Sequence, residues 1–471
     1  MVIAEQRVEP SRHADLTQKR SVNLDAANCQ ETFALSHGEQ GQARCGRFCR
    51  LFRSQDSPPG APADGCPLVP MGESEPPMER TVRNETSLVP RRLWISESTQ
   101  GRVTPAELFF DLVFVFVVTQ VTHAVESHPG WEGLLKGLFP MVIVWWMFSG
   151  FGWLTNAVRP DAVQVRLLLM LAMTGFFIMG LDVPYAFAPE GWAFPLAYLA
   201  VVAIHGIVYL TANVPSARQA ILRNMPFNAA AGLLVLVAPY LPEAWGWVCW
   251  AAAVLVLYLS PFLGRIRGFV LEPHHFVERH ALLLMVVLGE SVVAIGFGAE
   301  GSESHAVDIP LALGVVLGIA VASGLWWVYF DGDESRADAE FEKATEHRRQ
   351  MLAYYAFTGA HLVMIVGIIL VAAGITDAIH HFDGHAHRWW LGCGTALFLL
   401  GHAAYRGLLG SGRLTDRLVG AVCAVPLGAT ASIAGWIGMT LVVVVLAAIA
   451  TVDHRLASQR TQASQTALST G

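Results

Sequence analysis

Charged residues are scarce in this sequence. They make up 15% of its 471 residues, against 54% hydrophobic residues, whereas soluble chains carry about 25% charged residues. The charges cluster in short segments between long apolar runs, which is the pattern expected when lipid is the solvent. The composition therefore excludes an ordinary soluble globular protein, and with a net charge of −7 no basic surface points to nucleic acid as a partner.

Familiar catalytic and nucleotide-binding motifs are also missing. The sequence contains no nucleophile elbow, phosphate-binding glycine loop, dinucleotide fingerprint or zinc-protease helix motif. This disfavours an ATP-driven pump and predicts no cofactor. It also favours a nonenzymatic protein, while leaving an enzyme open.

The seven cysteines do not form a disulfide framework. Cys249, Cys393 and Cys423 lie in apolar runs, where a small buried side chain is the simplest interpretation. The other four lie in the first hundred residues, and the Cys45/Cys49 spacing lacks a second ligand pair. A structural zinc centre is therefore disfavoured there.

Residues 1–103 are rich in Arg, Ser, Pro, Glu and Gln and lack periodicity, so we expect a disordered cytoplasmic tail. No signal peptide begins at residue 1, and the first long apolar run is expected to remain as a signal anchor. One hypothesis is that translation starts at Met71 or Met78 instead. A short disordered tail is also expected over 456–471.

Apolar runs predict an all-α, polytopic membrane domain over 104–455. Most runs hold roughly 18 or more apolar residues, enough to cross about 30 Å of hydrocarbon. We expect about twelve transmembrane helices. Their ranges are 107–125, 134–154, 166–184, 193–212, 225–241, 244–263, 279–298, 309–330, 352–375, 388–409, 414–433 and 435–452.

Basic residues alternate between the connections of these spans. Lys and Arg fall at every second connection between spans, with the exceptions of Lys136 and Arg388. The connections in between hold mainly acids and histidines. The positive-inside rule then predicts that both the N- and C-termini are cytoplasmic. Six spans, a basic connection and six further spans suggest two parallel six-helix repeats.

Two carboxylates mark the start of the first span. Thr104 and Glu107 have the spacing of a capping box, with Pro105 at the first helical position, which gives Glu107 a structural role. Asp111 lies one turn deeper on the same face, among apolar residues. A structural and a functional role for Asp111 both remain open, because a buried acid in a membrane is costly.

The seventh span carries Glu278, Arg279, His280 and, three turns later, Glu290. Glu290 lies about 16 Å along the helix from Arg279, near the bilayer centre. Gly289 is expected to let a neighbouring backbone approach. Glu290 is the leading candidate for proton or cation passage; the alternative is a buried acid paired for helix packing.

Other polar residues fall within or between spans. Four single polar residues are interpreted as interhelical hydrogen-bond partners: His205, Asn228, His361 and His402. A histidine-rich connection follows the ninth span and predicts either a solvated loop or a site for zinc or another divalent ion. Its candidate ligands are His380, His381, Asp383, His385 and His387.

Two motifs resemble a known family. The run E-L-F-F-D-L-V-F-V stands unbroken from Glu107 to Val115, and E-R-H at 278–280 is followed by L-G-E-S at 288–291. Both are similar to hallmarks of the bacterial low temperature requirement protein A family, over roughly residues 100–455. The resemblance implies a many-helix bacterial membrane protein linked by name to growth in the cold, and it supplies no chemical activity.

The leading functional hypothesis is a secondary transporter or ion-conducting protein of the bacterial cell membrane. Its candidate coupling residues are Glu290, Asp111, Glu107, Glu278, Arg279 and His280. The alternatives are a membrane-embedded lipid-modifying enzyme and a noncatalytic membrane stress or scaffold protein. Membrane lipids and an unidentified small solute or ion are the expected partners, and assembly into a homo-oligomer stays open.

Overall fold

The structure is a computed structural model that describes residues 103–128, 130–157, 163–211, 215–264, 271–300, 307–387 and 389–470. Contacts divide the chain into two units, and the described residues lie in the second, Leu88–Gly471. Except for Val103, the predicted tail over 1–103 lies outside the described residues. The alternative translation starts at Met71 and Met78 lie outside them as well.

Every regular element in the described ranges is a helix, which confirms the all-α prediction. The first part of the membrane domain contains α3 (Pro105–Ser127), α4 (Trp131–Ala157), α5 (Val163–Asp182), η1 (Val183–Tyr185), α6 (Ala193–Thr211), α7 (Pro215–Val237), η2 (Ala238–Tyr240) and α8 (Glu243–Gly264). The second part contains α9 (Pro273–Glu300), α10 (Ile309–Phe330), α11 (Asp333–Lys343), α12 (Glu346–Leu352), the π-helical η3 (Ala353–Ala360), α13 (His361–His380), α14 (Trp390–Leu409), α15 (Thr415–Gly428), η4 (Ala429–Ser432) and α16 (Gly435–Thr470).

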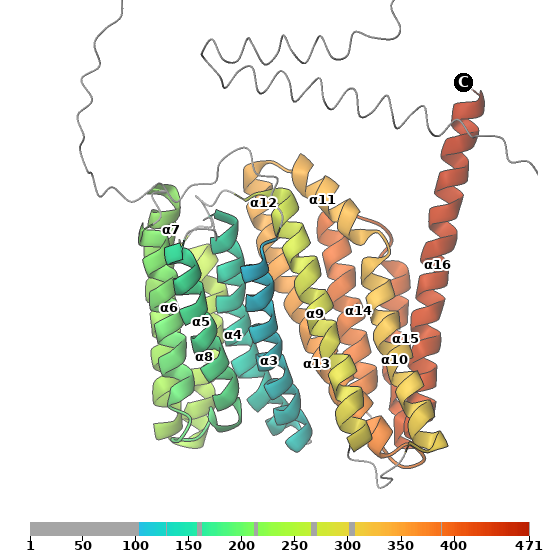
Figure 1. The fold of residues 1–471 in the computed structure, drawn as a ribbon, viewed down its shortest axis with the longest axis horizontal. Helices are drawn as coiled ribbons and strands as arrows, with labels where there is room; N and C mark the ends of the chain where they lie inside the picture. Colours follow the sequence, from blue (N-terminus) through green and yellow to red (C-terminus); the bar gives the residue numbers. More distant parts are fainter. Residues whose placement is uncertain are drawn as a thin grey trace, which may run out of the picture. The chain divides into compact units, whose positions relative to one another are not determined.

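Ten helical segments of the described chain are long and apolar enough to cross a membrane. The two remaining predicted spans, 388–409 and 414–433, are formed by α14 and by α15 with η4. Helix α14 carries the buried polar residues His402 and Arg406, and α15 has only 14 residues, which cover about 21 Å. Helix α14 packs against α13 and α15, and α15 packs against α14 and α16 (Figure 1), so the predicted multi-span fold is confirmed.

Helix α3 shows how the sequence builds a membrane helix. Thr104 and Glu107 form the predicted capping box around Pro105, which satisfies free backbone donors at the helix start. Phe110 is buried and Phe109 is 55% exposed. Apolar side chains therefore cover the outer face as well as the packed face, as a helix surrounded by lipid requires.

The helices pack in two groups that meet at α3 and α9. Each of the groups α3–α8 and α9–α16 is held together by contacts between its own helices. Across the boundary, α3 and α4 both contact α9 and α13 (Figure 1). This grouping agrees with the predicted division into six and six spans, while the internal sequence repeat stays a prediction. The boundary between α3 and α9 is called the α3–α9 junction below.

Two elements differ from the expectations. The charged helix α11 was not expected because it lacks a long apolar run, yet it is amphipathic and buries Ala337 and Phe341. The disordered tail expected over 456–471 is wrong for residues 456–470, because α16 continues to Thr470. Its Ala, Gln, Leu and Arg residues have high helix propensity, which sustains the helix beyond the apolar run.

Replacing Gly394 with alanine is expected to lower the free energy of unfolding by about 1–3 kcal/mol. Helices α13 and α14 pack closely at this position. A Cβ atom at Gly394 would lie 2.6 Å from the Val371 nitrogen and 2.8 Å from the Gly367 oxygen. The helices would have to separate, and thermal unfolding in detergent measures the loss.

Gly289 provides the matched control for this substitution. No atom of another described helix lies within 4 Å of a Cβ atom built there, so the expectation that Gly289 admits a neighbouring backbone is wrong. Gly289→Ala should leave the unfolding temperature unchanged or slightly raised, because alanine has the higher helix propensity. Equal stability of the Gly289→Ala and Gly394→Ala proteins would contradict the packing explanation.

Candidate functional site

A buried ionic network lies at the α3–α9 junction. Arg279 Nη1 donates to Glu107 Oε1 at 2.5 Å and to Thr155 Oγ1 at 2.7 Å, and its Nη2 lies 3.4 Å from Asp111 Oδ1. Glu107, Asp111 and Arg279 are 1%, 0% and 2% exposed. The structure therefore brings three of the predicted coupling residues together. These three residues and His275 are called the Arg279 network.

The hydrogen bonds of Asn156 determine the protonation of His275. Asn156 Oδ1 accepts from the Glu272 nitrogen at 2.7 Å, and its Nδ2 donates to the Glu272 oxygen at 3.1 Å. This orientation places Asn156 Nδ2 at 3.2 Å from His275 Nδ1. An amide nitrogen only donates, so Nδ1 accepts and carries no proton. His275 is therefore neutral, and its Nε2–H faces Glu107 Oε2 at 3.2 Å.

The Arg279 network has one more acid than base. Glu107 and Asp111 share a single arginine while His275 is neutral, so the ionised group carries one net negative charge. Asp111 Oδ2 is buried and has no hydrogen-bond partner among the described residues. An uncompensated buried charge costs several kcal/mol. The arrangement can therefore accept one proton or one monovalent cation at Asp111.

Glu278 and His280 flank Arg279 but do not enter its ion pairs. Glu278 Oε2 accepts from the Val103 nitrogen at 3.3 Å, next to the start of α3. His280 Nδ1 donates to the Phe276 oxygen at 2.8 Å, and its ring centre lies 5.5 Å from that of His361. Glu278 thus positions the chain before α3, and His280 connects α9 to α13.

Glu290 lies farther along the same junction. Its carboxylate accepts from Thr119 Oγ1 of α3 at 2.5 Å, and the side chain is 1% exposed. Asp111 and Thr119 are on one face of α3, two turns or about 12 Å apart, with Val115 between them. Asp111 and Glu290 therefore share the α3–α9 junction but belong to separate polar groups.

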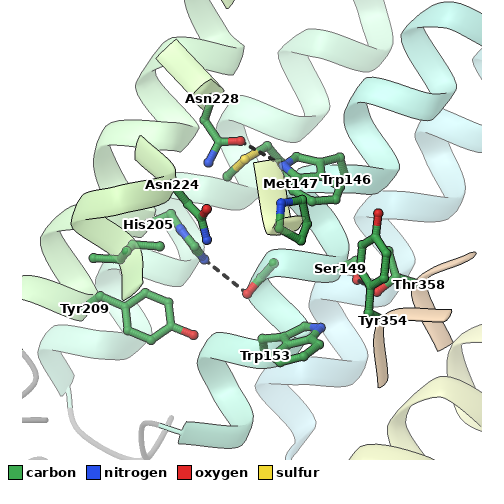
Figure 2. Close-up of a pocket in the computed structure, with 13 residues that line it drawn as sticks. Trp146, Met147, Ser149, Trp153, His205, Tyr209, Asn224, Asn228, Tyr354 and Thr358 are labelled. Atoms are coloured by element: carbon green, nitrogen blue, oxygen red, sulfur yellow. Dashed lines mark hydrogen bonds between the residues drawn. The ribbon is translucent and has the colours of Figure 1, made fainter. Parts of the chain in front are cut away.

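A pocket of about 90 Å³ lies between α4, α6, α7, α8 and η3 (Figure 2). Such a volume holds several water molecules. Its lining combines aromatic, amide, hydroxyl and apolar side chains, and none of the predicted coupling residues belongs to it. The lining residues are Trp146, Met147, Ser149, Gly150, Trp153, His205, Tyr209, Ile221, Asn224, Asn228, Pro261, Tyr354 and Thr358.

The π-helical segment η3 joins the pocket to the Arg279 network. Thr358 of η3 lines the pocket and lies 2.7 Å from the hydroxyl of Ser149. His361 follows within one turn and packs on His280, the neighbour of Arg279. Single π-helical turns occur frequently at functional sites. Residues of η3 and the start of α13 therefore contribute both to the pocket wall and to the packing around His280, which follows Arg279 in α9.

Comparison with known proteins agrees with the two sequence motifs. Residues 102–451 match the model of the family described as bacterial low temperature requirement A protein (LtrA). The chain belongs to the LtrA family. It is similar to the uncharacterized protein RA0937 of Rhizobium meliloti (strain 1021), with 25% identity over 298 residues, which are 60% of this chain and 71% of that protein. No solved structure matches the chain significantly.

All four single polar residues of the spans contact a neighbouring helix in this LtrA-family protein. His205, Asn228 and His361 do so through the expected hydrogen bonds, whereas the ring nitrogens of His402 have no hydrogen-bond partner among the described residues. His205 faces the Gly150 oxygen at 3.1 Å and Asn228 accepts from Trp146 Nε1 at 2.8 Å. The other two pairs are Tyr329 with His361 at 3.1 Å and Asp333 with His402 at 2.9 Å. The first two contacts also shape the pocket wall.

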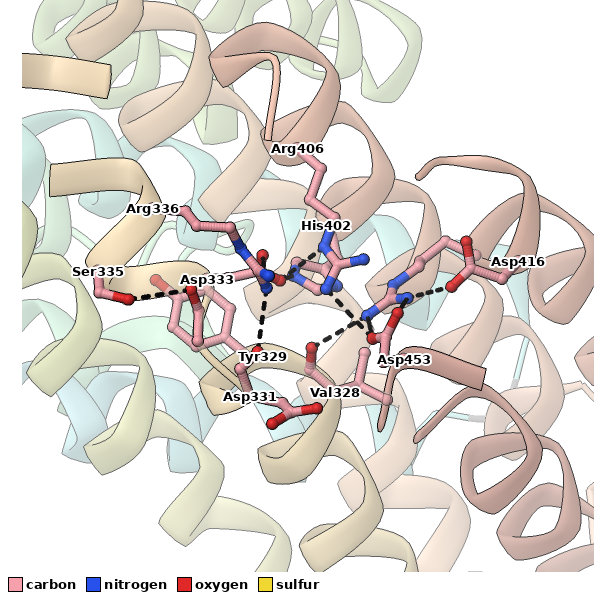
Figure 3. Close-up of polar contacts among 12 residues, drawn as sticks. Val328, Tyr329, Asp331, Asp333, Ser335, Arg336, His402, Arg406, Asp416 and Asp453 are labelled. Atoms are coloured by element: carbon pink, nitrogen blue, oxygen red, sulfur yellow. Dashed lines mark hydrogen bonds and ion pairs between the residues drawn. The ribbon is translucent and has the colours of Figure 1, made fainter. Parts of the chain in front are cut away.

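A second charged group of the LtrA-family protein lies where α11, α14, α15 and α16 meet (Figure 3). Arg406 donates to Asp333 Oδ2 at 2.6 Å and to Asp453 Oδ2 at 3.2 Å, and Arg417 Nη1 donates to Asp453 Oδ1 at 2.8 Å. We call Asp333, His402, Arg406, Asp416, Arg417 and Asp453 the Arg406 network. Nothing in the sequence indicated it, because Arg406 and Arg417 lie near the ends of predicted spans, where basic residues ordinarily mark a cytoplasmic connection.

In the histidine-rich connection, His381 and His387 both lie beside Asp377 Oδ1, at 3.2 and 3.1 Å. His380 and His385 face backbone oxygens instead. In the part of the chain that the structure describes, no group of three or more His, Cys, Asp or Glu residues is arranged to hold a metal ion. Asp383 is exposed. The metal-site hypothesis stays a prediction.

Proposed function

We propose that this LtrA-family protein is a secondary transporter or ion-conducting protein in which Asp111 binds and releases a proton or a monovalent cation. The observation that carries the proposal is the charge imbalance of the Arg279 network, in which two buried carboxylates share one arginine beside a neutral histidine. A purely structural ion pair has no need for the second acid, because burying it is costly.

The position of the network supports this role. Transporters built from two halves place their ion and substrate sites where the halves meet. Asp111 and Arg279 come from α3 and α9, the helices that meet at the boundary between the two helix groups. The pocket beside η3 supplies room for a solute, and η3 connects it to the network.

We further propose that the protein lies in the bacterial inner membrane with both termini in the cytoplasm. The alternation of basic connections supports this orientation. The Arg279 network, near the start of α3 and α9, would then lie toward the cytoplasmic side. Membrane lipids and a small solute or ion are the proposed partners, and a homo-oligomer stays a prediction.

Asp111→Asn is expected to reduce ion flux roughly tenfold or more, because it removes the group that exchanges charge within the membrane. The amide retains the size of the side chain and leaves Glu107 and Arg279 as a balanced pair. Full-length protein in liposomes containing a pH-sensitive dye would be given a pH gradient, and uptake of ²²Na⁺ and ⁸⁶Rb⁺ would be measured in parallel.

Glu132→Gln is the matched control, because Glu132 is an exposed acid that pairs with Lys136 at the start of α4. Its flux should equal that of the unmodified protein. If the protein is a noncatalytic scaffold, the unmodified protein should show no ion flux, and Asp111→Asn should change only the stability of the protein. Equal flux in Asp111→Asn and unmodified liposomes would overturn the proposal. No observation favours the lipid-modifying enzyme, which stays an untested alternative.

A further inference from the structure

We propose that the pocket beside η3 binds a small, uncharged solute that has both hydrogen-bonding groups and an apolar or planar face. The inference rests on the proposed function for its role in transport, because this solute would be the transported molecule. The binding site itself stands on the pocket's own geometry.

The lining contains no Asp, Glu, Lys or Arg side chain. A charged ligand in this pocket would therefore have no ionic partner within a bundle surrounded by lipid, at a cost of several kcal/mol. His205 is 5% exposed, and burial disfavours the charged form of its imidazole. Its Nε2–H is used by the Gly150 oxygen at 3.1 Å. The pocket therefore favours an uncharged ligand.

Two asparagines give the pocket complementary hydrogen-bonding groups (Figure 2). Asn224 Oδ1 is buried and has no partner among the described residues, so it can accept a hydrogen bond from a ligand. Asn228 Oδ1 already accepts a hydrogen bond from Trp146 Nε1 at 2.8 Å. The amide nitrogen of Asn228 is therefore the group that can donate to a ligand. An unpaired buried acceptor is costly to leave unsatisfied, so a ligand donor at Asn224 is favourable.

Aromatic side chains form a large part of the remaining wall. Trp146, Trp153 and Tyr354 line the pocket together with Met147 and Pro261. Aromatic rings offer large apolar surfaces for a planar or apolar group, and binding sites commonly combine such surfaces with a few polar groups that orient the ligand. The volume of about 90 Å³ limits the buried part of the ligand to a compact group.

Three probes of similar size that share a 4-fluorophenyl ring test the inference: 4-fluorobenzyl alcohol, 4-fluorobenzylamine and 4-fluorobenzoate. Near neutral pH they carry zero, one positive and one negative charge. Broadening of the ¹⁹F signal by the full-length protein in detergent reports binding, after subtraction of the broadening in detergent alone. The alcohol is expected to bind more tightly than either ion. Asn224→Leu is expected to weaken its binding about fivefold, the value of one hydrogen bond.

Thr174→Val is the matched control, because Thr174 is an exposed residue of α5 that bonds only to its own helix. It should leave binding of the alcohol unchanged. Tighter binding of the amine than of the alcohol would overturn the inference, because it would indicate an aromatic site for a cation. Equal binding to unmodified and Asn224→Leu protein would overturn it as well.

The outcome is separable from that of the flux experiment. No ion gradient enters the binding measurement, and Asp111→Asn should bind the alcohol normally. Asp111-dependent flux without Asn224-dependent binding would remove only the solute site. Binding without any flux would leave the solute site and remove the proposed transport function.

Discussion

Replacing Arg279 with glutamine is expected to lower the free energy of unfolding by about 3–5 kcal/mol, the range for breaking a buried ion pair. Arg279 is the single arginine that bonds to Glu107 and Asp111, and all three residues are at least 98% buried. Without it, two carboxylates remain at membrane depth with no cation. The variant should lose its monodisperse peak at a lower temperature on size-exclusion chromatography in detergent.

The double variant Arg279→Gln/Asp111→Asn should recover part of this loss, because it leaves one uncompensated carboxylate instead of two. Arg455→Gln serves as the control, since Arg455 is exposed on α16 and surface substitutions change stability by about 0.5 kcal/mol or less. An Arg279→Gln protein as stable as the unmodified one would mean that the carboxylates are neutral without the arginine.

Asp453→Asn is expected to destabilise the protein by about 3 kcal/mol or more. Asp453 of α16 accepts hydrogen bonds from Arg406 of α14 and from both terminal nitrogens of Arg417 of α15. Arg406 and Arg417 are 2% and 0% exposed. The amide would leave one positive charge unbalanced and weaken the attachment of α16, and thermal unfolding measures the loss.

Glu340→Gln is the matched control for this network. Glu340 pairs with Lys343 at 3.0 Å on the exposed side of α11, and exposed ion pairs contribute about 0–1 kcal/mol. Hydrogen exchange of α16 should rise in Asp453→Asn and stay unchanged in Glu340→Gln. Unchanged exchange in both variants would show that Asp453 does not anchor the helix.

The two networks predict opposite consequences for removing an acid. Arg336 of α11 also donates to Asp333, at 2.8 Å. With Arg336 included, three arginines balance the three aspartates Asp333, Asp416 and Asp453, so Asp453→Asn creates an excess charge. The Arg279 network has one acid too many, so Asp111→Asn removes an excess charge and should leave stability unchanged or raised. This contrast separates a structural ionic cluster from one whose charge changes during function.

Several features of the fold followed directly from the sequence. Long apolar runs predicted the membrane helices, because each must satisfy its own backbone hydrogen bonds when lipid surrounds it. The capping box at Thr104 and Glu107 was also predictable, since its residues are neighbours in the chain. The buried acids Asp111 and Glu290 stood out because ionisable residues are rare in apolar runs.

The partners of those acids were decided by tertiary structure alone. Arg279 lies 168 residues from Asp111 in the chain and meets it at the α3–α9 junction, whereas Glu290 on the same helix pairs with Thr119 instead. The Arg406 network and the pocket likewise combine residues from four or more helices. Hydropathy is a local property that determines which segments enter the membrane. Charge balance and cavities depend on which helix faces pack together, and that depends on side chains far apart in the sequence.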